Sequence, residues 1–209
     1  MNIISWNCRG LGILQLVRAL TKLVRVEALL LIFLVGIKAK VPNMARLQTK
    51  LDYTQGLIVP SDGKSGGLAL LWKEGINVWT HKYSNSHIDV VVTDTTSNMW
   101  WRATGFYSHP DTQKRHMSWK LQCLSSQLSL PWLVFGDFNE ITHLKEKCGW
   151  AERNADQMMA FRNSLDACNL QDLGFSGSNY TWCNGRFGSQ RTLIRLDRMV
   201  ANAEWRSLF

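Results

Sequence analysis

Hydrophobic and polar residues follow patterns that predict a β-α-β unit at the start of the chain. Between residues 14 and 26, apolar side chains recur at steps of three and four with basic residues between them, which predicts an amphipathic helix. The segment 3–6 before it is β-prone, and the apolar run 29–35 after it is typical of a strand buried on both faces. The first strand ends in a polar cluster that begins at Asn7.

Short β-prone segments fill the middle of the chain. A second helix is predicted over residues 44–51, and strands are predicted at 57–59, 67–72, 76–80, 87–93 and 100–107. Turn residues at 61–63 and 65–67 separate the first of them. The close spacing of the segments favours antiparallel sheets.

The second half of the chain mixes helices and strands. Helices are predicted at 112–128 and 155–168, an apolar strand at 132–135, and short strands at 180–183 and 193–200. Helices on both sides of a strand-rich middle predict an α/β (α+β) fold, with two sheets packed together and helices outside. The length of 209 residues fits a single domain, residues 1–209.

Charge adds a prediction about partners. Lysine and arginine number 24 against 16 aspartate and glutamate residues, a net charge of +8. Such a surplus attracts polyanions, because contacts to phosphates release counterions and charge steers the encounter. A basic surface without a specific partner is the alternative interpretation.

Cysteine usage and hydropathy predict an intracellular protein, in the nucleus or the cytoplasm. Five cysteines without a Cys-X-X-Cys pair argue against a disulfide framework or a zinc knuckle. No signal peptide is evident, and the most apolar run, residues 28–37, has about half the length that a membrane span needs. We therefore expect no membrane segment.

Two polar residues follow the apolar strand 132–135. Asp137 and Asn139 are two positions apart, so their side chains project to the same side, and Gly136 leaves room for a close approach. Such a pair can hold a hydrated cation, accept a proton from water or donate to a phosphate oxygen. The alternative is an Asp/Asn turn that caps a strand.

Polar side chains close other predicted strands as well. Asn7 ends the first strand, and Arg9 offers a guanidinium for phosphate two residues later. Tyr107 ends another strand, where its hydroxyl can meet a phosphate. Each has a structural alternative: a turn asparagine for Asn7, a rim tyrosine for Tyr107, an ordinary strand threonine for Thr181 and a surface ion-pair ladder for Asp197 and its basic neighbours.

Five motifs in order carry a resemblance to a known family. They include Ser5-Trp6-Asn7-Cys8-Arg9-Gly10, Ser65-Gly66-Gly67-Leu68, Gly105-Phe106-Tyr107-Ser108, Gly136-Asp137-Phe138-Asn139 and Arg195-Leu196-Asp197-Arg198. Together they resemble the endonuclease/exonuclease/phosphatase superfamily, and most closely the endonuclease domain encoded by plant LINE-type non-LTR retrotransposons. The resemblance implies a four-layer αββα sandwich of two mainly antiparallel sheets. It also implies an enzyme that cuts phosphodiesters with Mg²⁺ or Mn²⁺. The retrotransposon branch nicks target DNA, so DNA is the implied partner.

The resemblance also implies roles for individual residues. Asn7 matches the asparagine beside the metal and the phosphate, and Tyr107 matches the tyrosine that contacts the scissile phosphate. Asp137 matches the aspartate that orients or deprotonates the attacking water, and Asn139 is its partner on the phosphate or metal side. Asn7, Asp137 and Asn139 are thus the implied metal-side residues.

Two late residues complete this comparison. Thr181 resembles the threonine near the phosphate, and Asp197 resembles the carboxylate that orients a catalytic histidine. The family's Ser-Asp-His motif, which supplies that histidine, is expected after Phe209, so the domain is expected to be truncated with its last strand or strands missing. His109 and His143 do not lie in such a motif.

Besides the Ser-Asp-His motif, the chain departs from the family's pattern at the metal-binding glutamate. The family's main metal-binding glutamate follows the second buried strand, where this chain has Gly36. Glycine offers no side-chain ligand, and Mg²⁺ prefers anionic oxygen. The sequence therefore predicts a degenerate endonuclease with little or no activity. An active endonuclease whose missing groups are compensated, an inactive nucleic-acid binder and a gene relic that does not fold remain open alternatives.

Overall fold

The computed structural model describes residues 2–8, 14–37, 41–62, 65–111, 121–150 and 152–209. The chain divides into two compact units, Met1–Phe106 and Tyr107–Phe209, and each is described by itself. The single domain that the sequence predicts stays a prediction. Within the described residues, no helix is both long and apolar enough to cross a membrane.

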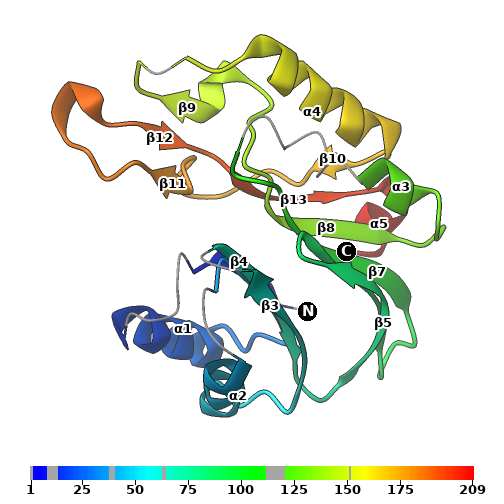
Figure 1. The fold of residues 1–209 in the computed structure, drawn as a ribbon. Helices are drawn as coiled ribbons and strands as arrows, with labels where there is room; N and C mark the ends of the chain where they lie inside the picture. The colour runs from blue at the N-terminus through cyan, green and yellow to red at the C-terminus, as the bar shows by residue number, and fades with distance from the viewer. Residues whose placement is uncertain (1, 9–13, 38–40, 63–64, 112–120, 151) are drawn as a thin grey trace. The chain divides into compact units, whose positions relative to one another are not determined.

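A four-stranded sheet opens the first unit (Figure 1). Its order is β1 (Ile3–Asn7), β2 (Leu31–Val35), β4 (Ser65–Trp72) and β3 (Gln55–Asp62). β1 pairs with β2 in parallel, because α1 (Leu14–Val26) returns the chain between them, and the other pairs are antiparallel. The predicted β-α-β opening is confirmed.

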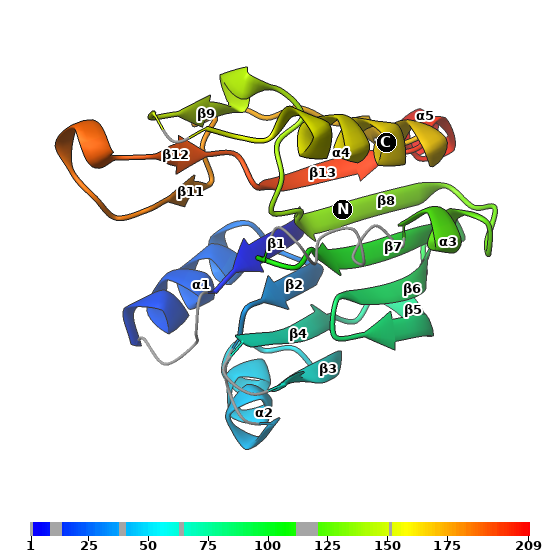
Figure 2. The same ribbon diagram turned by 45° about the horizontal axis from the view of Figure 1, so that its top comes forward.

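Helices α1 and α2 (Val41–Lys50) cover one face of this sheet (Figures 1 and 2). The amphipathic pattern explains the packing, because the apolar side of each helix is buried while its charged side faces solvent. The buried side chains of this layer include Leu20, Val24, Met44 and Leu47 from the helices and Ile32, Leu34, Ala69 and Leu71 from the sheet.

Three antiparallel strands complete the first unit: β5 (Ile76–Ser84), β6 (His87–Asp94) and β7 (Trp100–Tyr107), whose last residue belongs to the second unit. Gly105 of β7 lies against the ring of Phe33 in β2, so the two layers of strands touch there. A methyl group at residue 105 would lie 2.5 Å from ring carbons of Phe33.

Gly105→Ala is therefore expected to lower the free energy of unfolding by about 1–3 kcal/mol, because the added carbon overpacks a closed interface. Urea unfolding measures this difference. The double variant Gly105→Ala/Phe33→Leu removes ring atoms from the clash, and it should lose less stability than the two single changes together. Strictly additive losses would contradict the contact.

The second unit contains three antiparallel strands, a small sheet of short strands and several helices. The three strands have the order β10 (Gln171–Asp172), β13 (Asp197–Ala201) and β8 (Trp132–Asp137), and the small sheet has the order β11 (Trp182–Cys183), β12 (Leu193–Ile194) and β9 (Lys147–Cys148). The helices are α3 (Leu121–Ser125), η2 (Leu144–Glu146), α4 (Ala155–Ala167), η3 (Gly188–Gln190) and α5 (Ala203–Leu208).

Helix α4 lies along β13 in this unit (Figure 2). Asn154 caps its first turn by accepting hydrogen bonds from the N–H groups of Asp156 and Gln157. The ring of Phe161 packs against Phe138 with 5.4 Å between centroids. The helix thereby packs against the segment that directly follows β8.

Three predictions about elements are corrected. The strand predicted at 193–200 is two strands, β12 and β13, separated at Arg195 and Leu196, whose N–H groups bond to Glu146 and Thr181 rather than to a neighbouring strand. The turn residues at 61–62 and 65–67 lie within β3 and β4, which extend as a hairpin. Of the helix predicted at 112–128, α3 is shorter, and residues 112–120 lie outside the described residues.

Candidate active site at the ends of β8 and β13

Two carboxylates face each other where β8 ends and β13 begins. Asp137 is the last residue of β8, Asp197 is the first of β13, and the two are register partners in the antiparallel pair. Directly paired residues have Cα atoms about 4.5–5.5 Å apart and side chains on the same face of the sheet. The structure thus brings together two predicted site residues that are far apart in the sequence.

Asn139 is held beside Asp137 by a tight turn. The Oδ1 atom of Asp137 accepts a hydrogen bond from the backbone N–H of Asn139 at 2.8 Å, and Asn139 has φ +53°, which asparagine tolerates. The amide nitrogen of Asn139 donates to the Ser108 carbonyl at 2.8 Å. The Asp/Asn turn is therefore present. Because the side-chain nitrogen of Asn139 donates to Ser108, the side-chain oxygen is the atom that can accept a hydrogen bond or bind a cation.

Tyr107 belongs to the same group of residues. Its neighbour Ser108 donates a backbone hydrogen bond to the Asp137 carbonyl at 2.8 Å, which joins the end of β7 to the end of β8. Burial and then the negative charge of Asp137 raise the pKa of the Tyr107 phenol. The phenol therefore stays protonated at neutral pH and can donate to a phosphate oxygen.

Thr181 has a structural task that the sequence did not reveal. It lies just before β11, and its hydroxyl oxygen accepts hydrogen bonds from the N–H groups of Leu196 and Asp197, both at 3.0 Å. These two N–H groups lie at the break between β12 and β13, where strand pairing does not satisfy them. Thr181 therefore positions the backbone of Asp197, and its O–H remains as a donor.

Thr181→Val is expected to lower the free energy of unfolding by about 1–2 kcal/mol, because two backbone donors lose their acceptor while the side-chain shape is kept. Thr181→Ser keeps the oxygen and is the matched control. Urea unfolding of both variants measures the difference. A valine variant as stable as the serine variant would show that water replaces the hydroxyl without loss.

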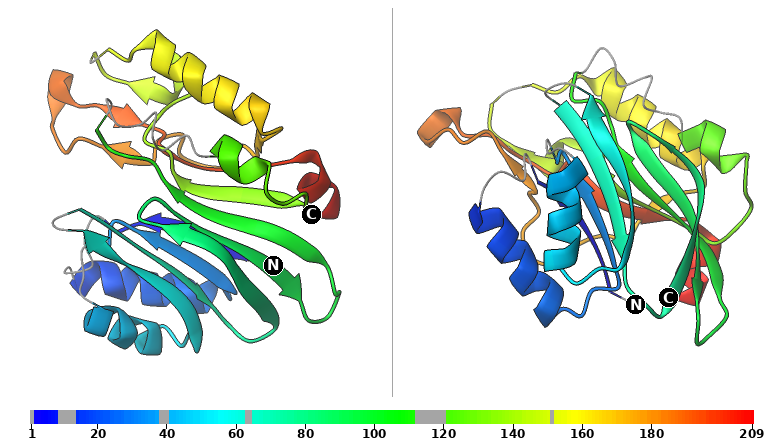
Figure 3. Two further views of the ribbon diagram at one scale, coloured as in Figure 1. Left: turned by 45° about the vertical axis from the view of Figure 1, so that its right-hand side comes forward. Right: turned by 60° about the horizontal axis from the view of Figure 1, so that its bottom comes forward.

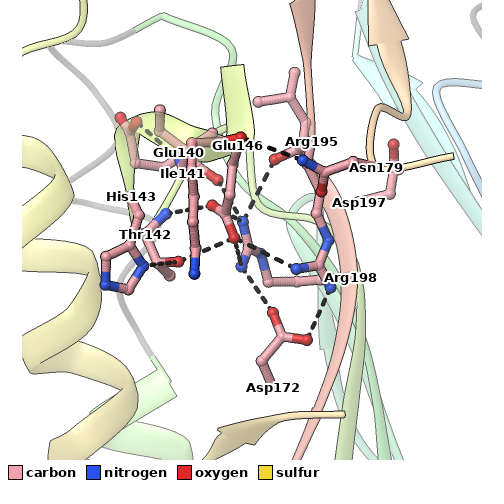
Figure 4. Close-up of polar contacts among 12 residues, drawn as sticks. Glu140, Ile141, Thr142, His143, Glu146, Asp172, Asn179, Arg195, Asp197 and Arg198 are labelled. Atoms are coloured by element: carbon pink, nitrogen blue, oxygen red, sulfur yellow. Dashed lines mark hydrogen bonds and ion pairs between the residues drawn. The ribbon is translucent and has the colours of Figure 1, made fainter. Parts of the chain in front are cut away.

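A closed ring of ion pairs supports the strand that carries Asp197 (Figure 4). Arg198 contacts Glu146 at 2.9 Å and Asp172 at 2.8 Å, and Arg195 contacts the same carboxylates at 3.3 Å and 2.8 Å. Arg195 and Arg198 are both buried. The surface ion-pair ladder considered from the sequence is therefore wrong, because the break in the strand lets both buried arginines reach the same two carboxylates, Glu146 and Asp172.

Glu146 is the centre of this ring. Burial by itself raises the pKa of its carboxyl, but the hydrogen bonds and charge of Arg198 outweigh that effect, and with bonds from Thr142 the pKa falls to about 2. Local patterns carry no signal for Glu146, since its arginine partners lie 49 and 52 positions later. Its contacts join the segment after Asn139 to the start of β13.

The remaining predicted residues lie in the first unit. Asn7 ends β1 as the register partner of Val35, so Gly36 follows β2 at the same edge of the sheet. Gly36 is buried and has φ +66°, a conformation that favours glycine. Arg9 lies outside the described residues.

Oxygen donors suited to a divalent cation are few. Asp137, Asp197 and the amide oxygen of Asn139 are hard ligands of the kind that Mg²⁺ takes. Within the part of the chain that the structure describes, however, no group of three or more His, Cys, Asp or Glu side chains is placed to hold a metal ion.

Comparison with known proteins identifies the fold. A family model described as the Endonuclease/Exonuclease/phosphatase family matches residues 4–209. The endonuclease domain of TRAS1, a telomere-specific non-LTR retrotransposon, has a TM-score of 0.73 at 12% identity, over 99% of this chain and 87% of that one. No curated protein sequence matches the chain.

Two further solved structures are similar. The AP endonuclease LMAP from Leishmania major has a TM-score of 0.74 at 14% identity, over 98% of this chain and 80% of that one. A 3′ phosphatase from Neisseria, bound to a product DNA hairpin, has a TM-score of 0.67 at 14% identity, over 97% and 87%. The predicted fold class, two mainly antiparallel sheets flanked by helices, is confirmed.

Proposed function

Because the chain belongs to the endonuclease/exonuclease/phosphatase family, we propose that it is a DNA-directed phosphodiesterase domain of the retrotransposon endonuclease type, with impaired catalysis. The observation that supports this function best is the facing pair of Asp137 and Asp197, with Asn139 held beside it. The five motifs favour the plant LINE-type branch, and the similar structures include a retrotransposon endonuclease.

In this proposal each candidate site residue of the second unit has a defined task. Asp137 orients a water molecule and accepts its proton, as general-base catalysis requires. The protonated phenol of Tyr107 donates to a phosphate oxygen, and Asn139 lies on the phosphate or metal side. Thr181 and the ion-pair ring hold Asp197 opposite Asp137, so that orientation contributes to the reaction.

The proposed impairment lies in the metal site. Members of the family use divalent metal ions, and we propose Mg²⁺ or Mn²⁺ here. When bound, such an ion neutralises charge that develops on the phosphate. Gly36 stands beside Asn7 at the position of the family's glutamate and supplies no carboxylate. The proposed metal-side residues Asn7, Asp137 and Asn139 then bring a single anionic ligand.

A plasmid-nicking assay with Mg²⁺ and with Mn²⁺ tests this function. The wild-type chain and Asp137→Ala are both expected to nick at the background rate, because the metal site is incomplete in each. Wild-type turnover that Asp137→Ala abolishes would show that the site is active and would overturn the proposed impairment.

A nucleic-acid binder without catalysis is the second candidate, and the net charge of +8 favours it. DNA binding that weakens steeply with salt, without cleavage, is the expected behaviour of such a protein. A non-cooperative melt would instead indicate a chain that does not fold stably.

A further inference from the structure

The basic surplus is concentrated in the first half of the chain rather than in the second unit, which holds the candidate catalytic residues. Residues 14–50 contain seven lysine and arginine residues and one glutamate, whereas residues 107–209 contain twelve basic and ten acidic ones. The second unit, which holds Asp137 and Asp197, is therefore almost neutral. The charge that attracts polyanions belongs mainly to the segment of α1 and α2.

Four of these basic side chains line one groove between α1 and α2. Arg18, Lys22 and Arg25 lie four and three positions apart along α1, so they share one side of the helix, and Lys50 ends α2. A cavity of about 340 Å³ lies between them, and its lining residues are Arg18, Thr21, Lys22, Arg25, Val26 and Lys50. Figure 3 shows α1 and α2 side by side on the sheet that they cover.

No carboxylate lines this groove, and none of the four basic side chains forms an ion pair with another residue that the structure describes. Arg25 and Lys50 lie in the last turns of their helices, where a positive charge is favourable. That explanation does not extend to Arg18 and Lys22, which repel each other from neighbouring turns. A bound polyanion would relieve this repulsion.

We propose that this groove binds the phosphate backbone of duplex DNA, through residues other than the candidate catalytic ones. The choice of DNA as the polyanion rests on the proposed function. From Arg18 to Arg25 the helix rises about 10 Å, which is the axial length of about three phosphates of one strand. Contacts to phosphates carry no sequence information, so the groove binds duplexes regardless of sequence.

An anionic membrane surface fits this groove less well. A helix that binds in a membrane interface inserts its apolar face between the lipids. The apolar face of α1 is already buried, since Leu20 and Val24 pack in the core of the first unit. The charged face of α1 and the single exposed valine Val26 remain for a partner, which is too small an apolar surface to insert between lipids.

Binding to a fluorescein-labelled 30-bp duplex, followed by anisotropy in EDTA over a range of salt concentrations, tests the proposal. Lys22→Gln/Arg25→Gln is compared with Lys73→Gln/Lys82→Gln, which removes the same charge from the same unit. Glutamine has nearly the helix propensity of lysine, so α1 should keep its fold, and circular dichroism checks this.

We expect the Lys22/Arg25 double variant to lower the slope of log K against log salt by about 2 and the affinity at least about tenfold, because each phosphate contact contributes about 0.9 to the slope. The control should change both much less. Equal losses of DNA affinity in the two double variants would overturn the proposal. Binding to phosphatidylserine vesicles and to polyglutamate is measured in parallel, and a loss of binding confined to either of these would overturn it too.

The result also separates this inference from the proposed function. If the wild type binds DNA with salt dependence and both doubles bind alike, the groove fails while the nuclease function stands. If the Lys22/Arg25 double loses binding but a chain with Gly36→Glu and an added Ser-Asp-His motif does not nick DNA, the nuclease function fails while the groove stands. A wild-type chain that does not bind the duplex would overturn both.

Discussion

Gly36→Glu, in a chain extended by a segment with a Ser-Asp-His motif, is expected to raise Mg²⁺-dependent plasmid nicking by a factor on the order of 10² or more over Gly36→Ala. Residue 36 follows β2 at the edge of the sheet where Asn7 ends β1, so a carboxylate there adds an anionic oxygen beside a proposed metal-side residue. The added motif supplies a histidine of the kind that, by the resemblance, the carboxylate at the position of Asp197 orients.

Gly36→Ala is the matched control because Gly36 has φ +66°. Any side chain at that conformation costs about 1–2 kcal/mol, so alanine and glutamate strain the backbone alike, and glutamate adds a short aliphatic stem and the carboxylate. Asp137→Asn in the restored chain should return nicking to background. Equal rates for glutamate and alanine, or nicking that persists in EDTA, would contradict the role proposed for this position.

Arg198→Met is expected to lower the free energy of unfolding by about 3–5 kcal/mol, the largest stability effect that we predict. Arg198 is 4% exposed, and its guanidinium contacts both Glu146 and Asp172. Removing it leaves a buried carboxylate without its main partner, which costs more than the ion pair contributes. Urea unfolding at neutral pH measures the loss, with the exposed Arg206→Met as control.

Acid provides an independent check of the same ring. The pKa of Glu146 is lowered from 4.5 to about 2, so the stability from its ionised form is present above 4.5 and is lost as the pH falls through about 2. The shift corresponds to about 3 kcal/mol at most. Glu146→Gln, which cannot titrate, should lose less stability than the wild type over this range. Parallel pH profiles would show that Glu146 is not the group responsible.

Local patterns in the sequence determined the elements and the order of the motifs. The helix Leu14–Val26 and the strand Trp100–Tyr107 have the bounds that their periodicity predicts, because burial of one helix side, or of a whole strand, is written into neighbouring residues. The same holds for the buried strand at 132–135, although β8 continues through Asp137. The family and its fold followed from such segments and from the motifs at their ends.

Only the tertiary structure decided how distant residues meet. Asp137 and Asp197 face each other because the register of β8 and β13 pairs them, and register depends on packing rather than on either segment alone. The ring around Glu146 and the bonds that Thr181 accepts arise at the break between β12 and β13, where backbone groups turn to partners from other segments. Local periodicity contains no information about such partners. The motifs therefore predicted the site residues, whereas the residues that hold them in place became visible only in the three-dimensional contacts.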